Sequence, residues 1–286
     1  IKYTMAMTLV SLVLFVTGCK STSPKNVQVG LPEMVYIPAG DFLQGDMTAQ
    51  DSSASPVRTV NISEFLISST EVTISQWNQC VKDKKCDALE QNDNRYLQHP
   101  VVNISVEQAQ QYIDWLADVS GKSVRFPTES EWEYAAKGGK PTLYGITNKP
   151  EKVCRHANVG DINANLAKSD DLPFPCDDNS MGLANVKSYI PNLFGLYDML
   201  GNAAEITQDC WTPDYQKAPT NGDAVATKKC MASVVRGGTF QSGLSELNSH
   251  IRKLLLRQEK NTNTGFRVAL SVKKGLLDFD FKSLIE

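Results

Sequence analysis

The residues of this sequence best able to do chemistry are its seven cysteines. Cys19 stands alone near the N-terminus, whereas the other six lie between positions 80 and 230. Six thiols could form three disulfides, or their thiolates could ligate a metal such as zinc. A zinc cluster is disfavoured because the chain contains no Cys-x-x-Cys spacing and only three histidines. The even number of cysteines therefore favours three disulfides, which are typical of an exported protein.

The pairing of these cysteines is left open by the sequence, because six cysteines allow many combinations. We favour pairing between neighbours along the chain. Disulfides that close loops of this size stabilise a fold by roughly 2–4 kcal/mol. The expected pairs are Cys80–Cys86, Cys154–Cys176 and Cys210–Cys230.

The N-terminus supports export independently of the disulfides. Lys2 precedes a mostly apolar run from Met5 to Val16, which is followed by Thr17-Gly18-Cys19. A basic start, a short apolar run and a small-residue cleavage position are typical of a secretory signal peptide. The run is shorter than the roughly 20 residues of a membrane-spanning helix. Val-Thr-Gly-Cys also resembles a bacterial lipobox, whose cysteine is lipidated after cleavage. The alternative is an ordinary signal peptide with an unrelated cysteine.

The chain is therefore expected to have four regions. They are a signal peptide (1–18), a lipidated Cys19 with a flexible polar tether (19–31), one folded domain (32–272) and a C-terminal tail (273–286). Lys20 stands where aspartate would resemble an inner-membrane retention signal, so an outer-membrane anchor is expected, with the domain facing the periplasm or the cell surface. The expected partners are the lipid bilayer, through Cys19, and an envelope protein or cell-wall component. A net charge of −3 argues against nucleic acid, which binds basic surfaces.

Three helices are predicted within this domain, and each begins with a capping box. In this motif a Ser or Thr and a Glu or Gln three residues later satisfy each other's free backbone amides. The apolar residues that follow recur at helical spacing, so Trp77, Trp115 and Trp132 are expected in the core. The three capping pairs are Thr73 with Gln76, Ser105 with Gln108 and Thr128 with Glu131.

The strands are predicted at both ends of the domain. Residues 140–240 are rich in Gly, Pro, Asn and Asp and show little regular periodicity. A loop region of this length needs disulfides or bound metal to organise it. The predicted strands are 34–37, 57–62, 65–67, 233–236 and 265–270. The pattern predicts a mixed α+β domain with a large irregular half.

Seven motifs in order give the chain a family resemblance. It resembles the formylglycine-generating-enzyme, or sulfatase-modifying factor, family, whose fold is an α+β variant of the C-type-lectin-like fold with little regular secondary structure. The resemblance also supports the neighbour pairing of the disulfides. The motifs are MVYIPAGDFLQGD (34–46), STEVTISQWNQCV (69–81), HPVVNISVEQAQQYIDWL (99–116), VRFPTESEWEYAAKGG (124–139), NLFGLYDMLGNAAEITQD (192–209), VVRGGTFQS (234–242) and TGFRVAL (264–270).

The catalytic cysteines of that family are missing from this chain. The resemblance implies a copper(I) site made by two cysteines shortly after Arg-Gly-Gly, since soft thiolates suit that ion. The matching positions hold Ser242 and Leu247, and no cysteine follows Cys230. Copper is therefore not expected, and no residue is predicted to be catalytic.

Structural calcium is the cofactor that the resemblance still implies. Calcium takes hard oxygen ligands, and a tight turn can supply carbonyls between carboxylates. The alternative is that the Asp, Glu and Asn residues at these positions only cap turns. The first site would use the side chains of Asp198 and Glu205 with the carbonyls of Gly201 and Ala203. The second would use the side chains of Asn158 and Asp178 with the carbonyls of Val159 and Ser180.

Two functions remain open from the sequence. The first is a non-catalytic binding or scaffold lipoprotein of the cell envelope, because a rigid base with long loops supports recognition without chemistry. The second is a divergent oxidoreductase or sulfatase-modifying-type enzyme acting on a periplasmic protein. The second would use a groove near Ser242, Arg252 and Glu205. Of the arginines that match the family, Arg236 and Arg267 are expected to be buried, while Arg252 could contact a ligand.

Overall fold

The computed structural model of the protein describes residues 30–46, 52–90, 93–167 and 170–272. The predicted signal peptide, Cys19, nearly all of the tether and the tail 273–286 lie outside the described residues. Among the helices that are described, none combines the length and apolar character needed to cross a bilayer.

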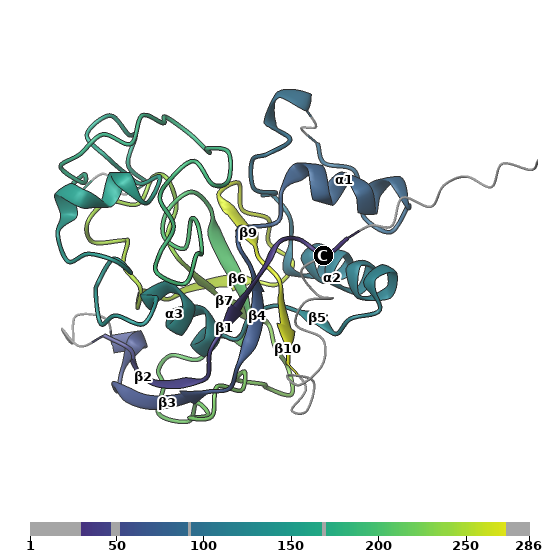
Figure 1. Ribbon diagram of the computed structural model, residues 1–286, viewed down its shortest axis with the longest axis horizontal. Coiled ribbons are helices and arrows are strands. Elements are labelled where there is room, and N and C mark those ends of the chain that lie inside the picture. Colours follow the sequence, from purple (N-terminus) through teal and green to yellow (C-terminus); the bar gives the residue numbers. More distant parts are fainter. Residues whose placement is uncertain (1–29, 47–51, 91–92, 168–169, 273–286) are drawn as a thin grey trace, which may run out of the picture.

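The described strands form three small sheets (Figure 1). The first is antiparallel, in the order β1-β4-β10-β5, and Ile67 of β4 pairs with both Val35 of β1 and Ala269 of β10. Its strands are β1 (Met34–Ile37), β4 (Phe65–Ser68), β10 (Ala269–Ser271) and β5 (Val124–Arg125). The second sheet is the hairpin of β2 (Gly40–Gln44) and β3 (Arg58–Ile62).

The third sheet carries Glu205, one of the predicted calcium ligands. Its order is β8-β7-β6-β9, with β6 antiparallel to β7 and parallel to β9. Glu205 of β6 pairs with Arg236 of β7 and with Gly265 of β9, so it occupies the centre of this sheet. The strands are β6 (Ala204–Cys210), β7 (Ala232–Arg236), β8 (Lys253–Leu256) and β9 (Thr264–Phe266).

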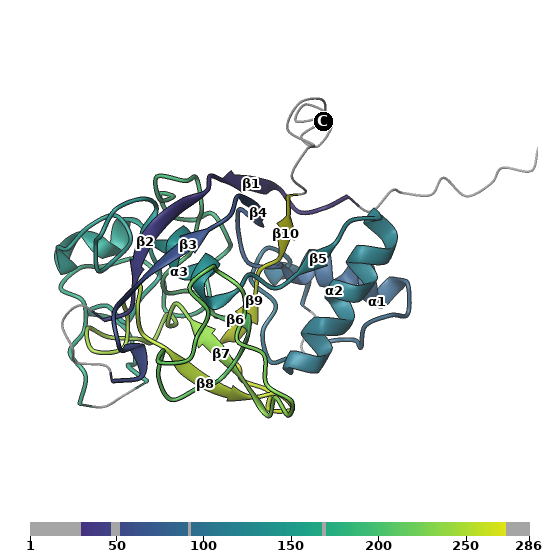
Figure 2. The ribbon, with the colours of Figure 1, turned by 90° about the horizontal axis from the view of Figure 1, so that it is seen from below.

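All three predicted helices are confirmed, and each has both hydrogen bonds of its capping box. Helix α2 ends at Gly121 and α3 at Gly138, both in the left-handed conformation that favours glycine at a helix end. Helices α1 and α2 pack together on one side of the molecule, whereas α3 contacts β2, β3, β6 and β7 (Figures 1 and 2). Their bounds are α1 (Ile74–Lys82), α2 (Val106–Ser120) and α3 (Glu129–Lys137).

The described apolar residues form two core clusters. Trp77, Trp115 and Phe266 belong to the cluster beneath α1 and α2, and Trp132 to the cluster around α3. The three tryptophans are at most 4% exposed, which confirms their predicted packing role.

The strand prediction was wrong for residues 265–270, and it missed β2, β5, β6 and β8. Residues 265–270 do not form one strand, because the chain leaves the third sheet after Phe266 and enters the first at Ala269. Between these strands the Arg267 side chain is fully buried against Glu205, which explains the break in pairing. The irregular region predicted for 140–240 also contains β6, whose polar side chains face the interior rather than alternating with solvent.

The three disulfides follow the predicted neighbour pairing. Cys80–Cys86 closes the end of α1, and Cys210–Cys230 joins the end of β6 to the chain just before β7. Cys154–Cys176 ties the 3-10 helix Pro150–Arg155 to the loop that precedes Asp178. The irregular half is therefore crosslinked where it carries predicted ligands.

Candidate metal sites and binding cleft

The first predicted calcium site is built on a tight turn that leads into β6. Asp198, Gly201 and Asn202 of this turn have φ angles of 55°, 75° and 50°, in the left-handed region. A Cβ at Gly201 would lie 2.0 Å from the Asn158 carbonyl oxygen, so only glycine fits. The turn brings Asp198, Gly201 and Ala203 next to Glu205, and all four residues are buried.

Two carboxylate oxygens at this site are buried without a hydrogen-bond donor. They are Asp198 Oδ1 and Glu71 Oε2, and both residues are at most 2% exposed. Burial raises the pKa of Asp198 to about 6. Burial also raises the pKa of Glu71 well above its usual range, and the negative charges of Asp198 and Glu205 raise it further. Unpartnered buried carboxylates are costly, so a bound cation fits this donor set.

Glu205 is held in place by hydrogen bonds from Arg267 and Trp132. Its Oε2 accepts hydrogen bonds from Arg267 Nε and Trp132 Nε1, each at 2.7 Å, while Oε1 accepts one from Arg267 Nη2 at 2.7 Å. A carboxylate oxygen can accept two bonds, so Oε1 keeps a lone pair for a metal. Glu71, Asp198 and Glu205 together carry three potential negative charges against the one positive charge of Arg267, and this imbalance also suits a cation.

Glu71 was missed by the sequence analysis. It lies within the family-like segment 69–81, and that position was the only signal that could have pointed to it. Its partners Asn202 and Arg267 are more than a hundred residues away in sequence, so no local spacing could reveal the cluster.

The second predicted site lies where two loops meet, beside the Cys154–Cys176 disulfide. Asp178 Oδ2 accepts the Val159 N–H at 2.7 Å, and Oδ1 accepts the Ser180 N–H at 2.8 Å. Asn158 is fully buried and its Oδ1 has no hydrogen-bond partner. The predicted ligands are thus adjacent, and the free amide oxygen fits a hard cation.

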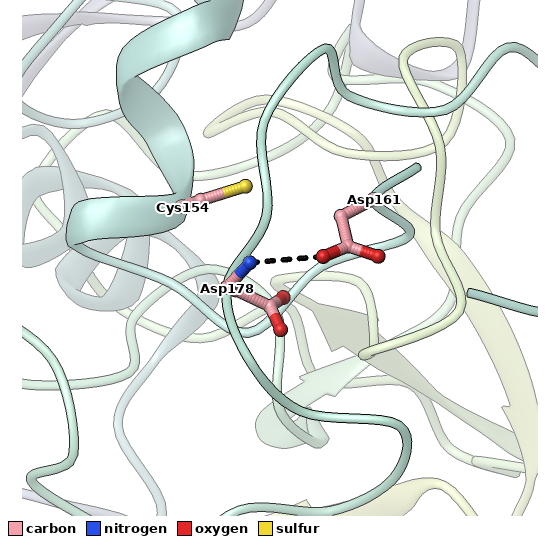
Figure 3. A group of neighbouring side chains, drawn as sticks. All are labelled: Cys154, Asp161 and Asp178. Carbon is pink, nitrogen blue, oxygen red and sulfur yellow. Dashed lines mark hydrogen bonds between the residues drawn. The ribbon is translucent and has the colours of Figure 1, made fainter. Parts of the chain in front are cut away.

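A further buried carboxylate, that of Asp161, lies against this second site (Figure 3). Its Oδ2 accepts the Asp178 N–H at 2.9 Å, and ligand atoms of Cys154, Asp161 and Asp178 lie within 4.8 Å of one another. Cys154 is in a disulfide and offers no thiolate, so the donors here are oxygens. Burial raises the pKa of Asp178 to about 6, and the charge of Asp161 adds a smaller increase. The sequence analysis did not identify Asp161.

The groove predicted near Ser242 and Arg252 is wrong. Ser242 is 2% exposed, and its Oγ accepts the Thr239 N–H at 3.0 Å. Arg252 is 5% exposed, donates to Glu129 Oε1 at 2.6 Å and stacks on Tyr215. Ser242 is hydrogen-bonded within its own turn, and Arg252 belongs to the interior because the buried Glu129 requires cationic partners. Leu247, at the second position matching a family cysteine, is fully buried in the core cluster around α3.

The two arginines that were expected to be buried, Arg236 on β7 and Arg267 between β9 and β10, are both buried. Arg236 is buried, and it forms ion pairs with Glu129 at 2.8 Å and Glu133 at 2.6 Å. The fully buried Arg267 pairs with Glu205 at 2.7 Å. These contacts brace the third sheet against α3 and the turn before β6.

A large cleft lies elsewhere, between the segment that joins α1 to α2 and the loops around residues 182, 240 and 262. Its volume is about 1220 Å³, and its lining carries charges of both signs together with the aromatic rings of Trp77, Tyr96 and Phe240. Arg95 lies over the ring of Tyr96, a residue that is 42% exposed. The charged and aromatic residues of the lining include Asp87, Glu90, Asp93, Arg95, Tyr96, Phe240 and Lys260.

Comparison with known proteins places these features in a family context. The profile of the sulfatase-modifying factor enzyme 1-like domain matches residues 20–272. A serine/threonine-protein kinase Pkn1 of Chlamydia trachomatis is 30% identical over 268 residues, covering 85% of this chain and 39% of the kinase. The chain thus spans about two fifths of the length of that relative.

Two further comparisons concern the enzyme and the fold. A formylglycine-generating enzyme of Thermomonospora curvata is 32% identical over 182 residues, covering 60% of this chain and 55% of the enzyme. The structure of PvdO from Pseudomonas aeruginosa superposes with a TM-score of 0.69 at 28% identity, covering 84% of this chain and 95% of PvdO. The α+β fold expected from the sequence is therefore confirmed.

Proposed function

We propose that this chain, which belongs to the sulfatase-modifying factor enzyme 1-like family, is a non-catalytic binding protein of the cell envelope. The observation that carries the proposal is the packing of Ser242 and Leu247. Both positions match the cysteines of the copper site, and here both side chains are interior residues, at 2% and 0% exposure. A hydroxyl bonded to its own turn and a leucine in the core supply neither soft ligands nor an open coordination position.

The binding surface in this proposal is the cleft between the α1–α2 connection and residue Phe240. Its volume exceeds the roughly 300–1,000 Å³ of most small-molecule pockets. The exposed Tyr96, the adjacent Arg95 and the aromatic Phe240 are residue types enriched in protein interfaces. The acidic residues and Lys260 in its lining suit a ligand with charges of both signs. We therefore infer that the ligand is a segment of another envelope protein.

The anchor in this proposal is Cys19. Lipidation of that residue would hold the domain at the outer membrane through the tether 19–31. Calcium at the two sites would be structural: it would neutralise the buried carboxylates around Asp198 and Asp178 and fix the loops that carry them. The unpartnered oxygens of Asp198, Glu71 and Asn158 support this role.

Site-specific photo-crosslinking in intact cells tests the binding proposal. A benzophenone side chain at Tyr96, inside the cleft, is expected to crosslink to a peptide segment that mass spectrometry can identify. The matched control is the same group at Leu172, which is 66% exposed and does not line the cleft. Lys260→Glu and Phe240→Ala should reduce the crosslink from Tyr96 several-fold. Equal crosslinking from both positions, or insensitivity to both cleft variants, would exclude the cleft as the binding surface.

The enzymatic alternative is tested with the same purified protein. After incubation with copper(I), oxygen and a cysteine-containing peptide, we expect no formylglycine product by mass spectrometry and no stoichiometric retention of copper. The Thermomonospora curvata relative provides the positive control for the assay. Formylglycine formed by this chain would overturn the non-catalytic assignment.

A further inference from the structure

The two predicted calcium sites are joined by one side chain, that of Asn202. This residue is fully buried, in the left-handed conformation, between Gly201 and Ala203. Its Oδ1 accepts a hydrogen bond from Asn158 Nδ2 at 3.1 Å, and its Nδ2 donates to Glu71 Oε1 at 3.0 Å. Asn158 belongs to the second site and Glu71 lies at the first, so a chain of two hydrogen bonds connects them.

The backbones of the two ligand loops also touch. The Asn202 N–H donates to the Asn158 carbonyl at 2.7 Å. The same carbonyl oxygen leaves no room for a Cβ at Gly201. The position of the turn that carries the first site is therefore set directly by the loop that carries the second.

The Asn158 amide and the Glu71 carboxylate, which both bond to Asn202, each carry one oxygen without a hydrogen-bond partner: Asn158 Oδ1 and Glu71 Oε2. Asn158 uses its Nδ2 toward Asn202, while its Oδ1 has no partner; Glu71 uses its Oε1 toward Asn202, while its Oε2 has none. We propose that Asn202 is a positioning residue that couples the two calcium sites, so that an ion at one raises the affinity of the other. This inference rests on the proposed binding of calcium.

The physical basis is the polarity of the hydrogen-bonded chain. A cation on Asn158 Oδ1 fixes the orientation of that amide, since only its Nδ2 can then face Asn202. The Oδ1 of Asn202 accepts this bond together with the Ala184 N–H at 2.9 Å, and the Nδ2 of Asn202 then faces Glu71. With Glu71 Oε1 engaged, Oε2 is the oxygen that remains for the first ion. An ion at either site thus orders groups that the other ion needs, and the second binding event loses less conformational entropy.

Calcium titration of the full chain, oxidised and stripped with a chelator, tests the coupling by calorimetry. Wild-type protein is expected to bind two ions with positive cooperativity, with a coupling factor of roughly 5–150-fold. Asn202→Gly keeps the left-handed backbone and removes the bridge, so two ions should bind independently. The matched control is Asn103→Gly, at another left-handed asparagine (φ 58°) outside this cluster, and it should leave the cooperativity unchanged.

A second measurement does not depend on a variant of Asn202. Asp178→Asn removes a ligand of the second site and should weaken the remaining first site by the coupling factor, and Asp198→Asn should weaken the second by the same factor, because coupling is reciprocal. Two ions that bind independently in wild-type protein would refute the coupling and leave the calcium proposal standing. No calcium binding by wild-type protein would refute the calcium proposal and the coupling with it.

Discussion

At the scale of single residues, the cluster around Asp198 is unfavourable unless a cation is present. Its Oδ1 has no donor, and the positively charged Arg267 beside it is shared with Glu205 and Glu71. Neighbouring Trp132 donates to Glu205, so Glu205 is well satisfied while Asp198 is not. The two carboxylates therefore have different roles: Glu205 holds the fold together, and Asp198 is the group that a metal would stabilise.

Asp198→Asn separates these roles. In chelator, the variant loses an unsatisfied buried charge. Its free energy of unfolding should therefore equal that of wild type or exceed it by up to about 1–3 kcal/mol. In calcium, the variant should gain less stability than wild type, because it has lost a charged ligand. Urea denaturation with and without calcium measures both effects, and the exposed Asp118→Asn on α2 is the control. A calcium-induced stabilisation equal to that of wild type would show that Asp198 is not a calcium ligand.

Asp209 gives the protein a pH dependence that does not involve the metal sites. Burial raises the pKa of this carboxyl to about 7, and the charge of Glu129 contributes further. Because the folded-state pKa lies above that of the unfolded chain, the folded state binds the proton more tightly. The stability from this group is complete below about pH 4 and is lost as the pH rises toward 7.

The Asp209→Asn variant should flatten this slope between pH 4 and 7. It should also lower stability overall, since Asp209 accepts the N–H groups of both Glu129 and Val225, and an amide oxygen can replace only one of these two contacts. Denaturant titrations at four pH values in chelator provide the comparison. An unchanged slope would show that another group is responsible.

At the scale of elements, the local signals were readable from the sequence and the non-local ones were not. Each capping box, at Thr73, Ser105 and Thr128, spans only four consecutive residues. The sequence alone therefore located all three helices. Strand β6 escaped because Glu205 and Asp209 face partners from distant segments, which hides the usual alternation. The fold class and the disulfide pairing could be predicted from spacing and family motifs.

The groove could not be predicted, for a related physical reason. From sequence alone, an arginine in a predicted loop can be taken for a ligand-contacting residue, because its acidic partner is not known. The partner of Arg252 is Glu129, more than a hundred residues away and itself buried at the start of α3. The cleft, in turn, is lined by residues from distant segments, such as Tyr96 and Phe240, and no single motif contains both.

The turn before β6 is the element whose geometry depends most on one glycine. Gly201→Ala would place a Cβ 2.0 Å from the Asn158 carbonyl and should cost about 3 kcal/mol or more, with loss of contact between the two ligand loops. Gly121 also has a positive φ, of 65°, but a Cβ there meets nothing within 4 Å. Gly121→Ala is thus the control and should cost about 1 kcal/mol. Equal costs from thermal unfolding would show that backbone strain alone, without the close approach, sets the requirement.

At the scale of the whole molecule, the disulfides brace a half with little regular structure. Their separations along the chain are 6, 22 and 20 residues, and longer closed loops restrict the unfolded chain more. Replacing Cys154 and Cys176 by serine should cost roughly 3 kcal/mol, against roughly 2 kcal/mol for Cys80 and Cys86. Since Cys154–Cys176 joins the loops of the second site, its loss should also weaken calcium binding, whereas loss of Cys80–Cys86 should not.

Paired serine variants, compared by denaturation and calorimetry, check this order. A larger loss of stability from the Cys80–Cys86 pair would contradict the loop-length argument. Unaltered calcium affinity without Cys154–Cys176 would show that the loops keep their positions through hydrogen bonds such as that from Val159 N–H to Asp178.

The short stretch from Thr264 to Ser271 takes part in two sheets. Strand β9 completes the third sheet beside β6, and β10 enters the first between β4 and β5. Neither sheet can close until these eight residues have left the ribosome, or the export channel if the chain is secreted. Assembly of the domain therefore waits for its last two strands, and a nascent chain interrupted before this stretch would present two unfinished sheet edges to its surroundings.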